Sequence, residues 1–233
     1  MINKNFLHYF ITGTNTNIGK TIISCALLSE FKKRGISCIG MKPIASGAYL
    51  NNKNKIWFNE DVNLLNKYSN SLYEFTKLIN PYLFKYPISP YTSSNLENRI
   101  INTSHIINCY NYLSNLTDVI ILEGIGGFSV PFHDNENSAD LAEKLGLPII
   151  LVIDLKIGCI NNALLSLEAI NSRGLKLIGW VANHTQIVDT LFANENYIEL
   201  TKYLNVTPLG RIPYLYNLNI NLISHYLDFS SLF

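Results

Sequence analysis

The chain has 233 residues, which is enough for one large α/β domain or two small ones to bury a hydrophobic core. Its 18 basic and 17 acidic residues leave a net charge of +1, and charged residues make up only 15% of the sequence. Because binding to nucleic acid or to a membrane surface relies on clustered Lys and Arg, this balance argues against both kinds of partner.

Other features of the sequence predict a soluble cytoplasmic protein. The longest apolar run, Leu147–Ile153, suits a buried strand and is too short to span a membrane. The first residues carry no long apolar stretch of the kind that a secretory signal requires. The four cysteines have neither disulfide-framework nor metal-ligand spacing, which is typical of reduced thiols in the cytosol.

Along the chain, apolar segments of strand length alternate with segments of helical periodicity. This alternation predicts βαβ units and a mostly parallel sheet between two layers of helices. The predicted strands are 8–12, 37–41, 117–122, 148–154 and 176–182, and the predicted helices are 20–33, 139–144 and 161–172. Three prolines break residues 70–103 into turns and short pieces. No repeat or linker interrupts the pattern, so we expect residues 1–233 to form a single domain.

The strongest motif is GTNTNIGKT over residues 13–21, which follows the first predicted strand and opens the first predicted helix. In such a loop, backbone N–H groups and the helix N-terminus surround a phosphate. Lys20 would then contact the β- and γ-phosphates, and the Thr21 hydroxyl would bind Mg²⁺. Five residues separate Gly13 from Gly19, one more than in the usual pattern, so Thr14 occupies the place of the usual first glycine.

A nucleotide-bound Mg²⁺ usually has a carboxylate at the end of a neighbouring parallel strand. Glu123 follows the apolar run VIIL and is succeeded by Gly124, Gly126 and Gly127, which leave room for phosphates. Asp61 is a second candidate ligand, although on its own it could equally cap a helix N-terminus.

Downstream of the loop, KPIASG (42–47) brings a lysine and a serine to the end of the second strand. With this motif the sequence resembles the dethiobiotin synthetases, which are ATP-dependent cyclo-ligases of biotin synthesis. The matching segments extend over nearly the whole chain and include NPYLF (80–84), LEGIGGF (122–128), KIGCINNALL (156–165), GWVAN (179–183) and GRIPYL (210–215). The resemblance implies a three-layer α/β/α P-loop NTPase fold and a homodimer.

The resemblance also implies a reaction and its site. The substrates would be 7,8-diaminononanoate, CO₂ and ATP, joined through a carbamate and a carbamic-phosphoric anhydride into a cyclic urea, with Mg²⁺ bound by Thr21, Asp61 and Glu123. Lys20, Lys42 and Ser46 would carry the catalysis. The implied nucleotide contacts are Asn17, Ile18, Gly19, Lys20, Thr21, Ile22, Asp61, Glu123, Gly124, Gly126, Asn183, Ile212 and Pro213. The implied substrate contacts are Ser46, Gly158, Cys159, Ile160, Asn161 and Tyr197, with the helix start at Gly158 and Tyr197 contributed by the other subunit.

The sequence departs from the family pattern at Asn15 and Asn17, where acidic residues are common, and at Asn162, where a histidine is common. Two rival functions remain open. A P-loop switch ATPase of the partitioning or septum-positioning type shares the sheet, but it carries an extra lysine early in the loop, and residues 14–18 contain none. An amide-forming ligase acting on another amine is disfavoured by Lys42, Ser46 and the GCIN segment.

Overall fold

The computed structural model describes residues 7–51, 55–70, 75–187, 190–217 and 219–232. Its centre is a six-stranded sheet in which all neighbouring strands run parallel. The strands, in spatial order, are β12 (Pro208–Ile212), β11 (Leu177–Asn183), β10 (Ile149–Asp154), β1 (Tyr9–Gly13), β7 (Val119–Glu123) and β2 (Cys38–Met41). Strand β7 lies between β1 and β2 and runs parallel to both, so the carboxyl ends of these three strands meet at one edge of the sheet.

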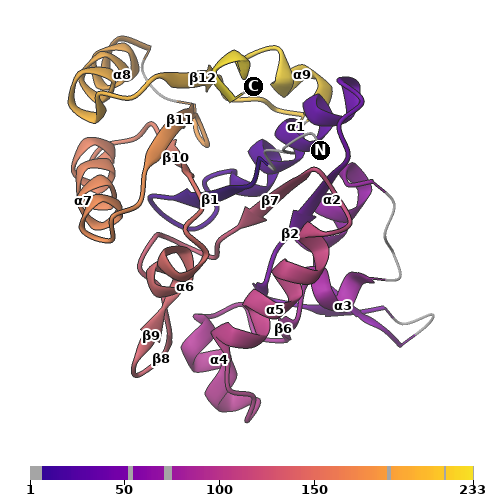
Figure 1. The fold of residues 1–233 in the computed structure, drawn as a ribbon. Coiled ribbons are helices and arrows are strands. Elements are labelled where there is room, and N and C mark those ends of the chain that lie inside the picture. Colours follow the sequence, from indigo (N-terminus) through magenta and orange to yellow (C-terminus); the bar gives the residue numbers. More distant parts are fainter. Residues whose placement is uncertain (1–6, 52–54, 71–74, 188–189, 218, 233) are drawn as a thin grey trace.

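Helices cover both faces of the sheet, which makes the three-layer α/β/α architecture expected from the sequence (Figure 1). One layer contains α1 (Lys20–Lys33), α2 (Glu60–Tyr68) and α9 (Ile220–Ser224). The other layer contains α5 (Thr103–Ser114), α6 (Ser138–Leu145), α7 (Cys159–Ser172) and α8 (Thr190–Leu204).

The alternation of side chains along β1 explains the two layers. Tyr9 and Ile11 belong to the buried cluster under α1, whereas Phe10 belongs to the cluster on the opposite face. All five residues of β1 are buried, as in a strand with helices on both sides. The sheet therefore holds the phosphate loop, which begins where β1 ends, on a support that is packed from both faces.

Shorter elements complete the fold between the long ones. Two-stranded pieces are formed by β3 (Ile44–Ser46) with β6 (Tyr82–Phe84), β4 (Tyr49–Leu50) with β5 (Trp57–Phe58), and β8 (Pro131–His133) with β9 (Glu136–Asn137). The remaining helical pieces are α3 (Thr76–Ile79), α4 (Pro90–Leu96) and a 3₁₀ turn (Ser230–Leu232). In the described residues, no helix is both long enough and apolar enough to cross a bilayer.

The predicted strands and helices are confirmed, with ends that shift by at most two residues. Helix α1 agrees at both ends, and the glycine that follows it, Gly35, has the left-handed φ of 74° expected after a helix. The described part of 70–103 consists of α3, β6 and α4, so its division into short pieces is also confirmed.

Candidate active site

The loop between β1 and α1 is held in shape by backbone conformation and by one side chain from a distant strand. Gly19, which precedes α1, has a left-handed φ of 93°. A Cβ atom at Gly19 would lie 2.4 Å from Asn183 Nδ2, so both the conformation and the space require glycine. Asn183 Nδ2 in turn donates to the Ile18 carbonyl at 2.9 Å, which fastens the loop to the end of β11.

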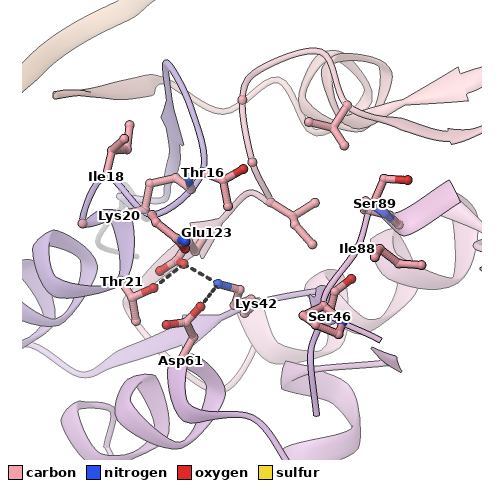
Figure 2. A pocket seen from close by; sticks show the side chains of 18 of the residues that line it. Thr16, Ile18, Lys20, Thr21, Lys42, Ser46, Asp61, Ile88, Ser89 and Glu123 are labelled. Carbon is pink, nitrogen blue, oxygen red and sulfur yellow. Dashed lines mark hydrogen bonds and ion pairs between the residues drawn. The ribbon is translucent and has the colours of Figure 1, made fainter. Parts of the chain in front are cut away.

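Four side chains from four segments of the chain converge beside this loop (Figure 2). Glu123 Oε1 accepts hydrogen bonds from the Thr21 hydroxyl at 2.7 Å and from Lys42 Nζ at 2.8 Å. Lys42 also forms an ion pair with Asp61. Lys20 lies next to this group, and its Nζ donates to the carbonyl of Asn15 in the same loop at 2.8 Å. The positive charges of the two lysines thus compensate the negative charges of the two carboxylates within one cluster.

The sheet and its connections position these groups. Glu123 ends β7 and lies beside Ile11 of β1, so the carboxylate comes to the start of the phosphate loop. Lys42 directly follows β2, and its carbonyl accepts from Asn80 Nδ2 at 2.6 Å. Asn80 belongs to the NPYLF segment, which therefore holds the backbone of Lys42.

Asp61 lies in the first turn of α2, but it is not the residue that caps the helix. Asn59 is the N-cap, and its Oδ1 accepts from the backbone N–H groups of Asp61 and Val62. The alternative interpretation of Asp61 as a capping residue is therefore wrong. Its carboxylate is free to face Lys42 instead.

Burial and neighbouring charges shift the pKa values in this cluster. The pKa of Lys20 is lowered to about 8, mainly because of burial; Glu123 and Asp61 act to raise it, and the nearby Lys42 acts to lower it. Burial also acts to lower the pKa of Lys42, but Glu123 and Asp61 outweigh it and the net pKa is raised. For Asp61, burial acts to raise the pKa, and Lys42 and Thr21 reverse this into a net decrease. Lys42 and Asp61 are therefore both charged at neutral pH.

These groups line a cavity of about 660 Å³ that is open on one side. Ser46 at the end of β3 lies in its wall, and its buried Oγ has no hydrogen-bond partner among the described residues. The wall next to Ser46 contains Ile88 and Ser89, which precede α4 (Figure 2). Sequence reasoning missed this wall, although a serine before Pro90 at the first position of a helix is a recognisable N-cap signal.

The donor set fits a hard divalent cation such as Mg²⁺. Thr21, Asp61 and Glu123 offer a hydroxyl and two carboxylates, which are the oxygen ligands that Mg²⁺ prefers. Glu123 Oε2 is buried without a hydrogen-bond partner among the described residues, so one carboxylate oxygen is available. Within the described ranges there is no group of three or more His, Cys, Asp or Glu side chains suited to a metal. Phosphate and water oxygens would have to complete the coordination.

A second cavity, of about 300 Å³, is also lined by residues of the phosphate loop. It contains Asn183, Ile212 and Pro213, as expected for the site of the base, together with Asn17 and Ile22 of the nucleotide set. The Asn183 amide uses one N–H to hold Ile18, and its second N–H and its oxygen can serve a base. Gly124 and Gly126 follow β7 beside the loop, and Gly126 has a left-handed φ of 64°.

The two predicted substrate elements from the other subunit do not line the large cavity of the same chain. Gly158 is the N-cap of α7, and Cys159, Ile160 and Asn161 form its first turn, so the predicted helix start is confirmed. Tyr197 lies on α8, where its ring packs against Trp180 at 5.3 Å and the Arg211 guanidinium stands 5.5 Å from the ring centre. The part of both elements in substrate binding stays a prediction.

A phosphate loop after β1, a carboxylate at the end of the adjacent β7, and helices on both faces of a parallel sheet define a P-loop nucleotide-binding protein. A ParA family ATPase from Chlorobium tepidum TLS superposes with a TM-score of 0.58 and covers 97% of this chain and 99% of its own. At 12% sequence identity, that similarity shows the fold alone. The family described as "AAA domain" matches residues 8–220.

Curated relatives show the family. The chain is 40% identical over 225 residues to the ATP-dependent dethiobiotin synthetase BioD of Janthinobacterium sp. (strain Marseille), with 96% of this chain and 94% of the relative covered. It is also 40% identical over 208 residues to the protein of that name from Aromatoleum aromaticum, with 89% and 90% covered. The chain belongs to the dethiobiotin synthetase family, and the resemblance stated from its motifs is confirmed.

Proposed function

We propose that this protein is an ATP-dependent cyclo-ligase that forms the cyclic urea of dethiobiotin from 7,8-diaminononanoate and CO₂. The observation that carries the proposal is the placement of Lys42 and Ser46 in the same cavity as the phosphate loop. The Ser46 hydroxyl has no hydrogen-bond partner among the described residues, so it can serve a substrate other than ATP in this cavity. The relatives that carry the synthetase name support the same activity.

The walls of the cavity suit the diamine. Ile88, Ile125 and Val130 give it apolar surface for an aliphatic chain, while the ends near Ser46 and Lys42 are polar. In the proposed reaction, an amine nitrogen bonds to CO₂ and loses a proton, which gives a carbamate. The Ser46 hydroxyl can hydrogen-bond to the carbamate, and Lys42 lies close enough to the same end to stabilise its charge.

Phosphoryl transfer follows. A carbamate oxygen attacks the γ-phosphorus, ADP leaves, and a carbamic-phosphoric anhydride forms. The second amine then attacks the carbonyl carbon and loses a proton, inorganic phosphate leaves, and the ring closes. Lys20, Lys42 and the N–H groups of the loop stabilise the negative charge that collects on the transferring group. Mg²⁺, held by Thr21, Asp61 and Glu123, would neutralise phosphate charge when it is bound.

We further infer that the substrate's tail carboxylate binds to a second copy of the chain. The N–H groups at the start of α7 are suited to a carboxylate, but this helix does not line the cavity that holds Lys42. A homodimer that brings the α7 start and Tyr197 of one subunit to the cavity of the other resolves this. The single-domain organisation of residues 1–233 and the cytoplasmic location belong to the same proposal.

The experiment that tests the proposed function is direct product detection. The purified protein is incubated with 7,8-diaminononanoate, ¹³C-bicarbonate and MgATP, and the products are followed by mass spectrometry. We expect one ¹³C atom in a cyclic urea, with one ADP formed for each product molecule. Diamine-independent ATP loss without the urea would favour a switch ATPase. ATP consumption that depends on another amine but not on the diamine would favour a different ligase.

A further inference from the structure

Asp154, the last residue of β10, is a buried carboxylate that the site described above does not use. Only 4% of its surface is exposed. Its Oδ1 accepts from the Thr185 hydroxyl at 2.8 Å and from the Thr185 backbone N–H at 3.2 Å, and its Oδ2 lies 3.0 Å from Lys156 Nζ. A buried carboxylate needs such partners to offset its lost hydration. Both partners lie outside the strands, on segments that leave the carboxyl end of the sheet.

The segment that contains Thr185 belongs to the nucleotide side of the molecule. Thr185 follows β11 and lines the 300 Å³ cavity together with Asn183. Asn183 also holds the phosphate loop through the Ile18 carbonyl. The position of residues 183–185 therefore affects both the base cavity and the loop, and two hydrogen bonds to Asp154 fix that position.

The segment that contains Lys156 leads to the start of α7. Lys156 lies between β10 and α7, and its carbonyl accepts from the backbone N–H of Cys159 at 3.0 Å. This hydrogen bond turns the chain into Gly158 and the first helical turn. The side chain of Lys156 is 41% exposed, so on its own it would have many conformations available, and the ion pair with Asp154 restricts them.

We propose that Asp154 is a positioning residue that orients two ligand sites at once, the base cavity through Thr185 and the N-terminus of α7 through Lys156. The α7 half of this inference rests on the proposed function, in which that helix binds the tail carboxylate of the substrate. In the proposed dimer, one carboxylate then connects the nucleotide site of its own subunit to the substrate site of the other.

Matched variants separate the two halves. Thr185→Val removes the hydroxyl at constant shape, and Thr185→Ser restores it. We expect the ATP dissociation constant, measured by calorimetry, to rise about tenfold in Thr185→Val and to return to within about twofold in Thr185→Ser. The KM for the diamine should stay within about twofold of the wild-type value in both variants. Calorimetry does not require catalysis. The ATP dissociation constants of the Thr185 variants therefore test the contact between Asp154 and Thr185 even if the diamine is not the substrate.

Asp154→Asn tests the other half, because the amide can still accept from Thr185 but no longer attracts Lys156. We expect the KM for the diamine to rise about tenfold, with kcat and the ATP dissociation constant within about twofold of wild type. The direction of the change in KM separates two explanations. If Asp154 acted only by repelling the carboxylate of the substrate, removal of its charge would strengthen binding and lower the KM. An unchanged or lower KM would overturn the α7 half, and unchanged ATP binding in Thr185→Val would overturn the nucleotide half. A wild-type protein that forms no cyclic urea would instead contradict the proposed function.

Discussion

Lys42 Nζ lies 2.8 Å from Glu123 Oε1, the same oxygen that accepts the hydroxyl of Thr21. With Asp61 on its other side, the ammonium compensates both carboxylates that are proposed to bind Mg²⁺. A divalent cation on these oxygens competes with Lys42 for the same negative charge. Binding of Mg²⁺ and nucleotide is therefore expected to loosen Lys42 from the carboxylates and to leave it available for the carbamate.

Lys42→Gln tests this competition. Turnover should fall by a factor on the order of 10²–10³, because a charge-stabilising group is lost, while ATP affinity changes little. The Mg²⁺ concentration for half-maximal nucleotide binding should decrease, since the carboxylates lose their internal cation. Lys144→Gln is the matched control, because it removes a lysine that pairs with Glu136 on a different part of the surface. An equal loss of ATP affinity and rate would assign Lys42 to the nucleotide site.

Glu123→Gln keeps the shape of the side chain but removes its charge. The variant should need a much higher Mg²⁺ concentration than the wild type for the same rate, and saturating Mg²⁺ should recover part of the activity. Titration of the rate against Mg²⁺ at fixed ATP measures this shift, with Glu136→Gln as the control. A superimposable titration curve would place Glu123 outside the metal site.

Lys20→Ala removes the cation of the phosphate loop. We expect turnover to fall by about 3–4 kcal/mol of transition-state stabilisation, on the order of 10²–10³ in rate. The thermal unfolding midpoint should change little, because the hydrogen bond that Lys20 donates among the described residues stays within the same loop, at the carbonyl of Asn15. A variant that retains more than half of the wild-type kcat would contradict the assignment of the loop.

Mixed dimers test whether the site is shared between subunits. Tyr197→Phe should weaken diamine binding by roughly 10–150-fold if its hydroxyl binds the carboxylate, with ATP affinity little affected. If Tyr197 acts on the neighbouring site, a heterodimer of Lys20→Ala and Tyr197→Phe subunits contains one doubly damaged site and one intact site. Mixing the two variants should then restore tight-binding activity. No recovery, with heterodimers demonstrated by differential tagging, would contradict the shared site.

Stability should depend on pH through His8. Burial lowers the pKa of His8, and its Nδ1 accepts the backbone N–H of Ile120 at 2.8 Å, which requires the neutral ring. The unfolded chain therefore takes up a proton before the folded one does, and the free energy of unfolding should fall as the pH decreases below 6.5. One such group contributes at most about 1.4 kcal/mol per pH unit. Denaturant unfolding at pH 7.0 and 5.5 measures the effect, which should be smaller in His8→Asn.

The elements with strong periodicity could be predicted from the sequence, and those defined by their neighbours could not. A glycine directly precedes residues 20–33 and another glycine lies just after them, and both ends of α1 can be predicted from these two signals. The edge strand β12 contains Gly210 and Arg211, and its strand conformation depends on pairing with β11. Helix α5 has buried residues at helical spacing, including Ile106, Tyr110 and Leu113, but its polar residues obscure the pattern.

The residues of the candidate site also fall into those that a motif predicts and those that only the folded structure brings to the site. Lys20, Thr21 and Glu123 lie in motifs whose spacing indicates their chemistry, and the structure brings them together. Ile88 and Ser89 follow β6 in the chain, and they line the cavity because β6 pairs with β3, which ends at Ser46. Asp154 does not belong to a recognisable motif. Its proposed positioning role follows only from its contacts with two loops in the folded structure.

The position of β7 between β1 and β2 also has a consequence for synthesis on the ribosome. The chain emerges from its N-terminus, so β1, the phosphate loop and β2 are made well before the strand that separates them in the sheet. Until residues 119–123 arrive, β1 and β2 have no common partner and Thr21 and Lys42 have no Glu123. A nascent chain that stops before β7 therefore lacks the carboxylate that we propose to bind Mg²⁺, and the proposed site cannot form until more than half of the chain has been translated.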